Sequence, residues 1–248
     1  MQLNADLGES WYHHRVGNDE ALMPYLDACN IACGLHGGDA LTMQKTIALA
    51  LEHDVSIGAH PSYPDRENFG RRRMQMDLPR LEALILYQVA ALQGMVAAQG
   101  GTVKHLKLHG ALYHAAATAK EAALPEAVVR VARQTGLQQI YGPPGSALAR
   151  ACELAGVTFV PEGFADRRYV TPSQLVNRTQ PGAVLATANE CARQAMSLAA
   201  GRVTLESGEQ ASIAIQTICL HGDHRDVAAR ANAVRNALGG KKDRPTDQ

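Results

Sequence analysis

The sequence predicts an α/β protein whose seven strands close into a TIM-like (β/α)7 barrel. Strand-like and helix-like segments alternate along 248 residues without an internal repeat. Polar or reactive side chains follow the carboxyl ends of at least five of the strands. These ends meet at one face of a closed barrel, whereas an open doubly wound sheet would spread them along an edge. The closed barrel is therefore the expected architecture.

Each expected strand is a short apolar or alternating run bounded by turn-forming residues. Four of the runs lead to a histidine that has glycine or alanine beside or near it. In chain order the runs are Leu3–Leu7, Cys29–Cys33, Ser56–His60, His105–His109, Gln139–Tyr141, Thr158–Pro161 and Thr217–His221.

The expected helices carry apolar residues at helical spacing and have recognisable ends. Asp39 is expected to cap the helix after the second strand, and Asp77 with Pro79 to begin the next. Gly136 and Gly156 are expected to end two others. The helical segments are Asp19–Leu26, Leu41–His53, Asp77–Gln99, Ala119–Gln134, the stretch before Gly156, Asn189–Ala200 and Asp226–Leu238.

Two long polar stretches, 61–74 and 167–181, are expected to be loops, and a hairpin is expected around Ser207–Gly208. Residues 1–240 are thus expected to form a single barrel catalytic domain. The polar residues 241–248 are expected to be a disordered tail.

The composition excludes several classes of partner. Lys and Arg number 24, as do Asp and Glu, so we expect neither nucleic acid nor an acidic membrane surface as a partner. Five cysteines without a CxxC pair indicate a reducing compartment. We recognise no basic leader and no apolar stretch long enough to cross a bilayer. A cytoplasmic protein is therefore expected.

The polar side chains at the strand ends form one candidate active site. Histidine exchanges protons near neutral pH and binds metals, and a small neighbour lets a substrate approach the backbone. The residues expected to be catalytic are Asp6, His36, His60, Lys107, His109 and His221. The residues expected to bind substrate are Asn4, Glu9, Arg71, Arg72, Asp166 and Asp223. The arginines belong to a run at the rim of the site and could hold a carboxylate or phosphate.

The residues leave two interpretations of this cluster open. Asp6 with two or more histidines would suit a divalent ion and leave a position for water. Alternatively, a metal-free cluster would use Asp6 to orient a histidine and the histidines to bind an anionic substrate. The sequence has no HExxH-like motif that would decide between the metal-binding and the metal-free interpretation. Lys107 pairs with a carboxylate in either a catalytic or a purely structural role.

No Walker-type GxxxxGK[ST] motif and no GxGxxG after a strand is present, so no familiar nucleotide site is expected in this chain. The residue chemistry favours hydrolysis of a C–N or C–O bond in a small anionic substrate.

Nine motifs occur in the order found in the LamB/YcsF family, which the chain resembles from residue 3 to about residue 238. They are LNADLGES, GNDE, CNIACGLHGGD, GAHPSYPD, FGRRRM, KLHGALY, FADRRY, RTQPGAVL and CLHGD. The departures are small: Ala5 stands where many members have cysteine, and Leu108 where many have proline. Neither removes a candidate catalytic side chain.

The resemblance implies a seven-stranded barrel of the glycoside hydrolase/deacetylase type. It also implies ATP-dependent hydrolysis of 5-oxo-L-proline (pyroglutamate) to L-glutamate, with the chain as the A component of a multi-subunit 5-oxoprolinase and subunits B and C as partners. ATP would be used by the complex, and the partners would make or share the activated lactam. That superfamily often uses an Asp–His–His metal site, which favours Asp6 with His36 and His60 as ligands.

In that reaction a histidine or Asp6 would be the general base, and His109, Lys107 or a metal would stabilise the oxyanion. Two other functions stay open. One is a metal-dependent deacetylase or amidase acting on an N-acylated sugar, and the other is a non-catalytic subunit that only binds 5-oxoproline.

Overall fold

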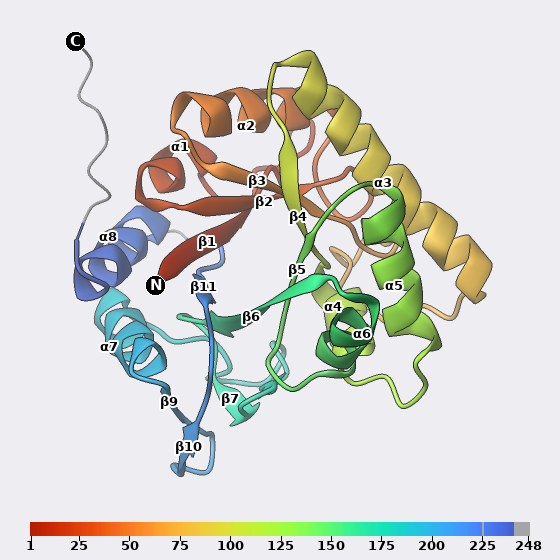
Figure 1. Cartoon of the computed structure of the whole chain (residues 1–248). Coiled ribbons are helices and arrows are strands. Elements are labelled where there is room, and N and C mark those ends of the chain that lie inside the picture. The colour runs from red at the N-terminus through yellow and green to blue at the C-terminus, as the bar shows by residue number, and fades with distance from the viewer. Residues whose placement is uncertain (225, 241–248) are drawn as a thin grey trace.

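The computed structural model describes residues 1–224 and 226–240, and its centre is a closed barrel of seven parallel strands (Figure 1). This confirms the predicted fold class. The order around the ring is β1-β11-β6-β5-β4-β3-β2. The barrel strands are β1 (Gln2–Leu7), β2 (Ala28–Ala32), β3 (Ser56–His60), β4 (Val103–Lys107), β5 (Gln139–Gly142), β6 (Thr158–Phe164) and β11 (Thr217–Cys219). The predicted tail, 241–248, lies outside the described residues.

Helices surround the ring, and most of the apolar core lies between them and the strands (Figure 1). Two antiparallel ribbons lie outside the barrel: β7 (Tyr169–Thr171) with β8 (Gln174–Leu175), and β9 (Arg202–Thr204) with β10 (Gln210–Ser212). The helices are α1 (Asp19–Leu22), the 3-10 helix η1 (Met23–Tyr25), α2 (Ala40–Glu52), α3 (Leu78–Ala98), α4 (Gly110–Ala117), α5 (Ala123–Gln134), α6 (Ala147–Ala155), α7 (Ala188–Ala199) and α8 (Val227–Ala237).

Several helix ends form at the residues that the sequence predicts. The Asp39 side chain accepts a hydrogen bond from the backbone N–H of Thr42 at 2.8 Å, and α2 begins there. Asp77 caps α3 in the same way through the N–H of Arg80. Gly156 takes the left-handed conformation that ends α6. The second ribbon, β9 with β10, is the hairpin expected around Ser207.

One helix, one ribbon and several boundaries differ from prediction, and the sixth and last barrel strands end at Phe164 and Cys219 rather than at Pro161 and His221. The helix expected from Ala119 begins at Ala123, and the preceding segment contains α4, which we did not predict. The fourth strand ends at Lys107 rather than His109, because the His109 N–H donates to the carbonyl of Pro61 at 2.9 Å and α4 starts next. The stretch 167–181, expected as a loop, contains the β7–β8 ribbon.

A polar layer fills part of the barrel interior. The ring of His105 (β4) lies against the backbone of Gly58 (β3), where a Cβ would be 2.0 Å from His105 Nε2. That nitrogen donates to Asn30 Oδ1 at 2.7 Å, and the ring stacks on Tyr141 with 4.0 Å between centroids. Burial, with Lys107 nearby, lowers the pKa of His105 to about 3, so the ring is neutral. The absence of a side chain at residue 58 is therefore a packing requirement.

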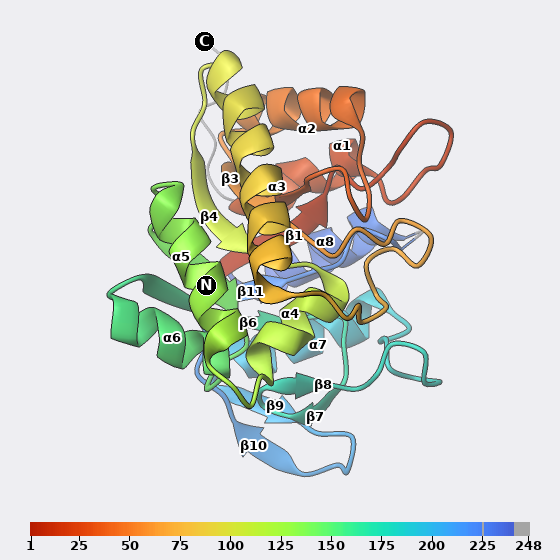
Figure 2. The same cartoon turned by 90° about the vertical axis from the view of Figure 1, so that its right-hand side faces the viewer.

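Within the described residues, α3 is the one helix that is long and apolar enough to cross a membrane, which the sequence pattern did not predict. One such helix is weak support for a span, because the core helix of a soluble protein meets the same criteria. The helix lies along the outside of the barrel (Figure 2). Its Ile85 and Leu92 side chains are buried. Its Gln88 side chain also exchanges two 2.9 Å hydrogen bonds with the backbone of Ser62. The buried residues of α3 therefore face the barrel, and 33% of its most apolar window is buried.

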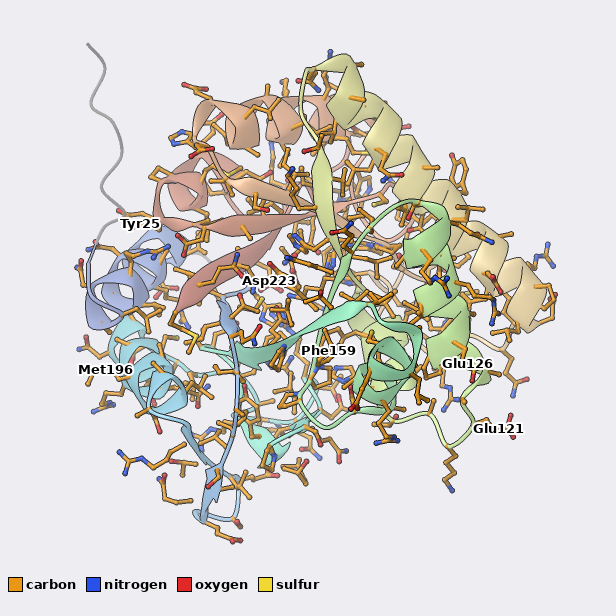
Figure 3. The ribbon with its side chains drawn as sticks, in the orientation of Figure 1. Tyr25, Glu121, Glu126, Phe159, Met196 and Asp223 are labelled. Atoms are coloured by element: carbon orange, nitrogen blue, oxygen red, sulfur yellow. The ribbon has the colours of Figure 1, made fainter. Side chains whose placement is uncertain are left out.

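Long loops extend on one side of the barrel, after β1 (8–18), after β3 (61–77) and after β8 (176–187) (Figure 2). Asp223, which follows β11, lies toward the middle of the ring, whereas Glu126 and Met196 lie on outer helices (Figure 3). The loops that follow the carboxyl ends of the strands can therefore supply the residues of a site.

Candidate active site

A cavity of about 600 Å³ lies at the carboxyl ends of the strands, within the size range of small-molecule sites. The predicted site residues that line it are Asp6, His60, Arg71, Lys107, His109 and His221. The predicted convergence of several strand ends on one site thus appears in the structure.

Lys107 lies between two carboxylates at the base of the cavity. Its Nζ is 2.9 Å from Asp6 Oδ1, 3.0 Å from Glu162 Oε1 and 3.1 Å from Cys219 Sγ. Burial opposes the charge of Lys107, but Asp6, Cys219 and Glu162 raise its pKa well above the usual value. Burial likewise opposes ionisation of Asp6, but His60 and Lys107 hold its pKa well below the usual value. Asp6 and Lys107 are therefore an ion pair at neutral pH.

Asn4, predicted to bind substrate, lies beneath this ion pair and does not reach the cavity. Its Nδ2 donates to Glu162 Oε1 at 3.0 Å and to Thr217 Oγ1 at 2.8 Å. Its Oδ1 accepts from Asn30 Nδ2 at 2.8 Å. Asn4 is fully buried, so the structure places it as a support for the acidic side chains.

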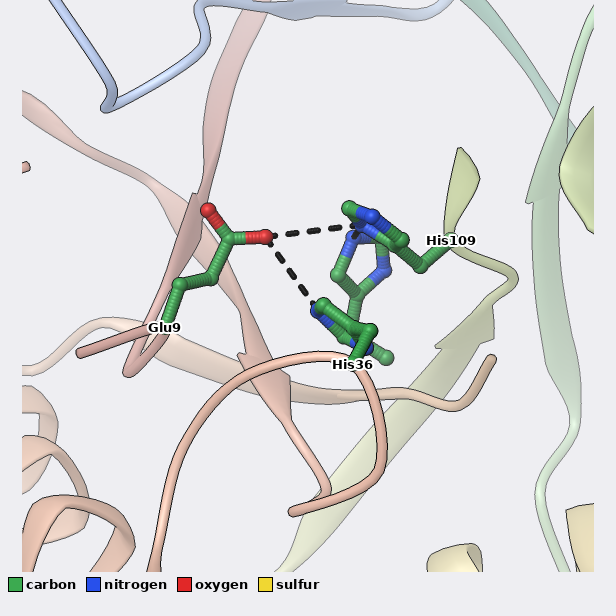
Figure 4. Close-up of side chains that lie close together, drawn as sticks. Glu9, His36 and His109 are labelled. Atoms are coloured by element: carbon green, nitrogen blue, oxygen red, sulfur yellow. Dashed lines mark hydrogen bonds and ion pairs between the residues drawn. The ribbon is translucent and has the colours of Figure 1, made fainter. Parts of the chain in front are cut away.

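Three histidines and Glu9 converge beside the ion pair (Figure 4). One potential ligand atom from each of Glu9, His36, His60 and His109 lies within 4.8 Å of the others. Glu9 Oε1 is 3.3 Å from His36 Nε2 and 3.4 Å from His109 Nδ1. The rings of His36 and His109 stack with 3.7 Å between centroids.

Backbone carbonyls determine which nitrogen carries hydrogen in two of these rings. His60 Nδ1 donates to the carbonyl of Lys107, and His109 Nε2 to that of Phe69, each at 2.8 Å, because a carbonyl can only accept. In the neutral rings the inward atoms, His60 Nε2 and His109 Nδ1, are bare and only 3.0 Å apart. Histidines that bind a metal have this arrangement, with the outer N–H held by a carbonyl. The donor set therefore fits a divalent cation such as zinc.

Burial sets the protonation of the same cluster. It lowers the pKa of His36 and of His109 well below the usual value, with further lowering from neighbouring histidines. Burial, together with Asp6, raises the pKa of Glu9 well above the usual value. Neutral imidazole is the form in which histidine binds a metal.

The metal set favoured by the resemblance, Asp6 with His36 and His60, is not the group that converges. Glu9 and His109 occupy the place expected for Asp6. Asp6 Oδ1 is held by the Lys107 ammonium, and its Oδ2 lies 3.3 Å from His60 Nε2. Asp6 is thus a neighbour of the histidine group, because its position in β1 directs it to the lysine.

A second cluster lies at the cavity wall and is centred on Asp166. Both carboxylate oxygens are 3.0 Å from His221 Nδ1, and Oδ2 is 2.9 Å from His224 Nε2. Burial opposes ionisation of Asp166, but the two histidines hold its pKa well below the usual value. A carboxylate only accepts, so His221 Nδ1 carries the hydrogen and Nε2 of the neutral ring is bare. This pair can accept a proton from a bound molecule.

Arginines on three segments complete the wall. Asp223 Oδ1 and Oδ2 accept from Arg178 Nη2 at 2.6 and 2.5 Å, and Oδ2 also accepts from Arg71 Nη2 at 3.0 Å. Arg167 lines the cavity as well. The predicted Arg72 does not line it: its side chain is 62% exposed and pairs with Asp65 at 3.4 Å. Arg72 therefore lies apart from the predicted residues that line the cavity.

Sequence reasoning missed several residues of this region. Glu162 was missed because the sixth strand was expected to end at Pro161; alternation carried further would have directed it inward. Tyr113, whose hydroxyl donates to Glu162 Oε2 at 3.1 Å, lies in the unpredicted α4. Arg178 and His224 lie in loops, where no periodicity identifies them.

Comparison with known proteins agrees with this architecture. The model of the LamB/YcsF family matches residues 1–245. The A component of a 5-oxoprolinase from Symbiobacterium thermophilum is 43% identical over 240 residues, which are 96% of this chain and 91% of that protein. A lactam utilization protein of Thermus thermophilus has a TM-score of 0.88 at 33% identity, with 96% and 95% of the two chains covered. A family 4 carbohydrate esterase of Streptomyces lividans, 12% identical over 96% and 86% of the two chains, shares the fold alone, with a TM-score of 0.50. The chain belongs to the LamB/YcsF family.

Proposed function

We propose that this chain hydrolyses activated 5-oxo-L-proline to L-glutamate as the A component of an ATP-dependent 5-oxoprolinase, together with subunits B and C. The family and the names of its relatives support a role in 5-oxoproline metabolism. The observation that carries the proposal is the Asp166–His221 pair, which borders the same cavity as the ionised Lys107.

The chemistry explains why ATP is needed. A five-membered lactam is an unstrained amide, and phosphorylation of its oxygen by ATP in the partners makes the carbon more electrophilic. Water then adds to that carbon, the C–N bond breaks, and the nitrogen takes a proton, which leaves an acyl phosphate. A second water converts the acyl phosphate to glutamate and inorganic phosphate.

Each step assigns a task to residues of this chain. His221 Nε2 takes the proton from the attacking water and delivers it to the departing ring nitrogen, while Asp166 stabilises the imidazolium. The Lys107 ammonium stabilises the negative charge that develops on oxygen. Asp6 holds Lys107 in its charged form.

Glu9, His36, His60 and His109 are proposed to hold a divalent metal next to this site. The bare, adjacent nitrogens of His60 and His109 support the assignment. When bound, such an ion supplies Lewis-acid polarisation of a carbonyl or phosphoryl oxygen.

We further propose that residues 1–240 act as one catalytic domain in the cytoplasm. The five cysteines are buried and unpaired, which suits a reducing compartment.

The test is glutamate release by the reconstituted complex with 5-oxoproline and ATP. His221→Ala and Asp6→Asn are expected to lower kcat by about 10²- to 10⁴-fold, the usual contribution of a general base or of a charged group at the reacting oxygen. Arg130→Gln is the matched control, because Arg130 is exposed, pairs with Glu82 and does not line the cavity.

Normal glutamate release by both variants would refute the proposal. If 5-oxoproline binding also survives in them, the chain is a binding subunit. Bound zinc with ATP-independent activity on an acetylated sugar would indicate a deacetylase instead.

A further inference from the structure

We propose that Arg71, Arg167 and Arg178 form a phosphoryl-binding subsite in the cavity wall, which holds the phosphate group of the activated substrate. The identity of that substrate rests on the proposed function, whereas the binding of phosphate itself does not. We call these three residues the arginine subsite.

The cavity is larger than the lactam requires. Its volume of about 600 Å³ suits a drug-sized ligand, whereas 5-oxoproline is a small ring with one carboxylate. The arginine subsite contributes to the same lining as Lys107 and His221. A substrate that reaches both regions must carry a second polar group.

Arg167 is the member of the subsite that forms no salt bridge with any described residue. It is only 4% exposed, and its Nη2 and Nε donate to the carbonyls of Val176 at 2.6 Å and Ala183 at 3.4 Å. In the described part of the chain no carboxylate lies within 4.0 Å of it. Burial, followed by the nearby positive charges of Arg178 and Arg71, lowers its pKa to about 10. Burying a guanidinium without a counter-ion is costly, and a bound anion would offset that cost.

The other two members share a single carboxylate. Asp223 accepts from both Arg178 and Arg71, so one negative charge faces two positive charges. The charge of Asp166 also acts on Arg167, but its two oxygens bond to His221 and His224 and form no salt bridge with the Arg167 guanidinium in the described part of the chain. Three guanidinium groups therefore face two carboxylates, and the subsite keeps a positive charge.

A phosphoryl group suits three neighbouring arginines better than a carboxylate does, because it offers three acceptor oxygens rather than two. A phosphate monoester carries a charge of about −1.5 to −2 at neutral pH, and a carboxylate carries one. The planar fork of arginine also fits phosphate oxygens in bidentate geometry. Since this chain has no glycine-rich phosphate loop, the phosphate is expected to arrive already attached to the substrate.

The test uses the purified full chain without its partners. Inorganic phosphate, acetyl phosphate and ATP are titrated separately by calorimetry, and phosphorus NMR follows the bound phosphate. We expect saturable binding of phosphate and acetyl phosphate that weakens with added salt. Arg167→Gln and Arg178→Gln should each weaken it at least tenfold, and Arg130→Gln should not change it. Circular dichroism checks folding, and Arg178, which is partly exposed, is the safer variant.

Unchanged phosphate binding in both variants would overturn the subsite. ATP binding more than tenfold tighter than acetyl phosphate would overturn the assignment to a phosphorylated substrate and indicate a nucleotide instead. The result is separable from the proposed function: lost phosphate binding in Arg178→Gln, with full glutamate release by a His221→Ala complex, supports the subsite and contradicts the hydrolytic role.

Discussion

The carboxylate of Asp166 holds His221 Nδ1 with both oxygens, each at 3.0 Å, so the tautomer of the ring is fixed before any ligand arrives. His221 borders the cavity, whereas Asp166 is fully buried. In the proposed reaction, His221 would exchange protons and Asp166 would orient its ring.

Replacing Asp166 by Asn should lower kcat of the reconstituted complex by about 10²- to 10⁴-fold, with a smaller change in KM. The amide nitrogen of Asn would face His221 Nδ1 and favour the wrong tautomer. His224→Ala is the comparison, because it removes one bond to Asp166 but leaves both oxygens near His221. We expect His224→Ala to lower kcat by less than tenfold. Equal losses in the two variants would contradict the orienting role.

Metal content distinguishes the two ligand sets. We expect one divalent ion per chain by elemental mass spectrometry, and metal-dependent thermal stability that a chelator abolishes. Glu9→Gln, His60→Ala and His109→Ala should lose the ion, whereas Asp6→Asn should retain it. Loss of the ion in Asp6→Asn with retention in Glu9→Gln would restore the set that the resemblance favoured.

Lys107→Met should destabilise the chain by about 3 to 5 kcal/mol, because it leaves Asp6 and Glu162 as buried, uncompensated carboxylates. Urea unfolding measures the change. The double variant Lys107→Met, Glu162→Gln should recover part of it. A double variant as unstable as the single one would show that the loss comes from packing.

Gly58→Ala should cost more than about 4 kcal/mol, because its Cβ would overlap the His105 ring. Adding His105→Ala should recover part of that loss by opening space. The control is Gly94→Ala in α3, where nothing lies within 4 Å, and a gain of about 0.5 to 1 kcal/mol is expected. Equal unfolding midpoints for the two single variants would contradict the packing argument.

Asp223 should contribute to stability above about pH 4 and lose that contribution in acid. Burial alone would raise its pKa, but Arg178, His221 and Arg71 lower it to about 2. The contribution is therefore complete above the unfolded value and disappears as the pH falls through the folded value. It amounts to at most about 2 kcal/mol. At pH near 6, Asp223→Asn should have a lower free energy of unfolding than the parent protein. Urea unfolding at decreasing pH should show this difference becoming smaller. A difference that does not change with pH would contradict the ion-pair account.

Local sequence signals predicted much of the barrel because they act over a few residues. Asp39 and Asp77 cap helices through their own backbone neighbours, and such caps are visible in the sequence. The short helix α4 has no side-chain cap, and its own residues, GALYHAAA, are mostly apolar without helical alternation, so neither a cap nor a periodic pattern indicated where it begins. The chain leaves the fourth strand early because His109 bonds to Pro61, a partner 48 positions away.

The sequence predicted which residues belong to the candidate site better than it predicted which of them contact one another. His36, His60 and His109 do meet, as the strand ends predict. Glu9 rather than Asp6 joins them because the loop after β1 turns back toward the rings, while Asp6 stays in the strand and reaches Lys107. Which carboxylate meets the histidines depends on the conformation of the loop, and the alternation of side chains along a strand does not predict that conformation. Arg167 and Arg178 were missed for the same reason.

Closure of the barrel by its first and last strands bears on how the protein matures. Gln2 pairs with Thr217, 215 positions later, so the ring stays open until nearly the whole chain has left the ribosome. Incomplete chains present the unpaired edges of β1 and β6, which favour aggregation and proteolysis. Asp6 and His221 likewise come together only at that moment. The cavity that these two side chains line is therefore complete only after the last barrel strand has been synthesised.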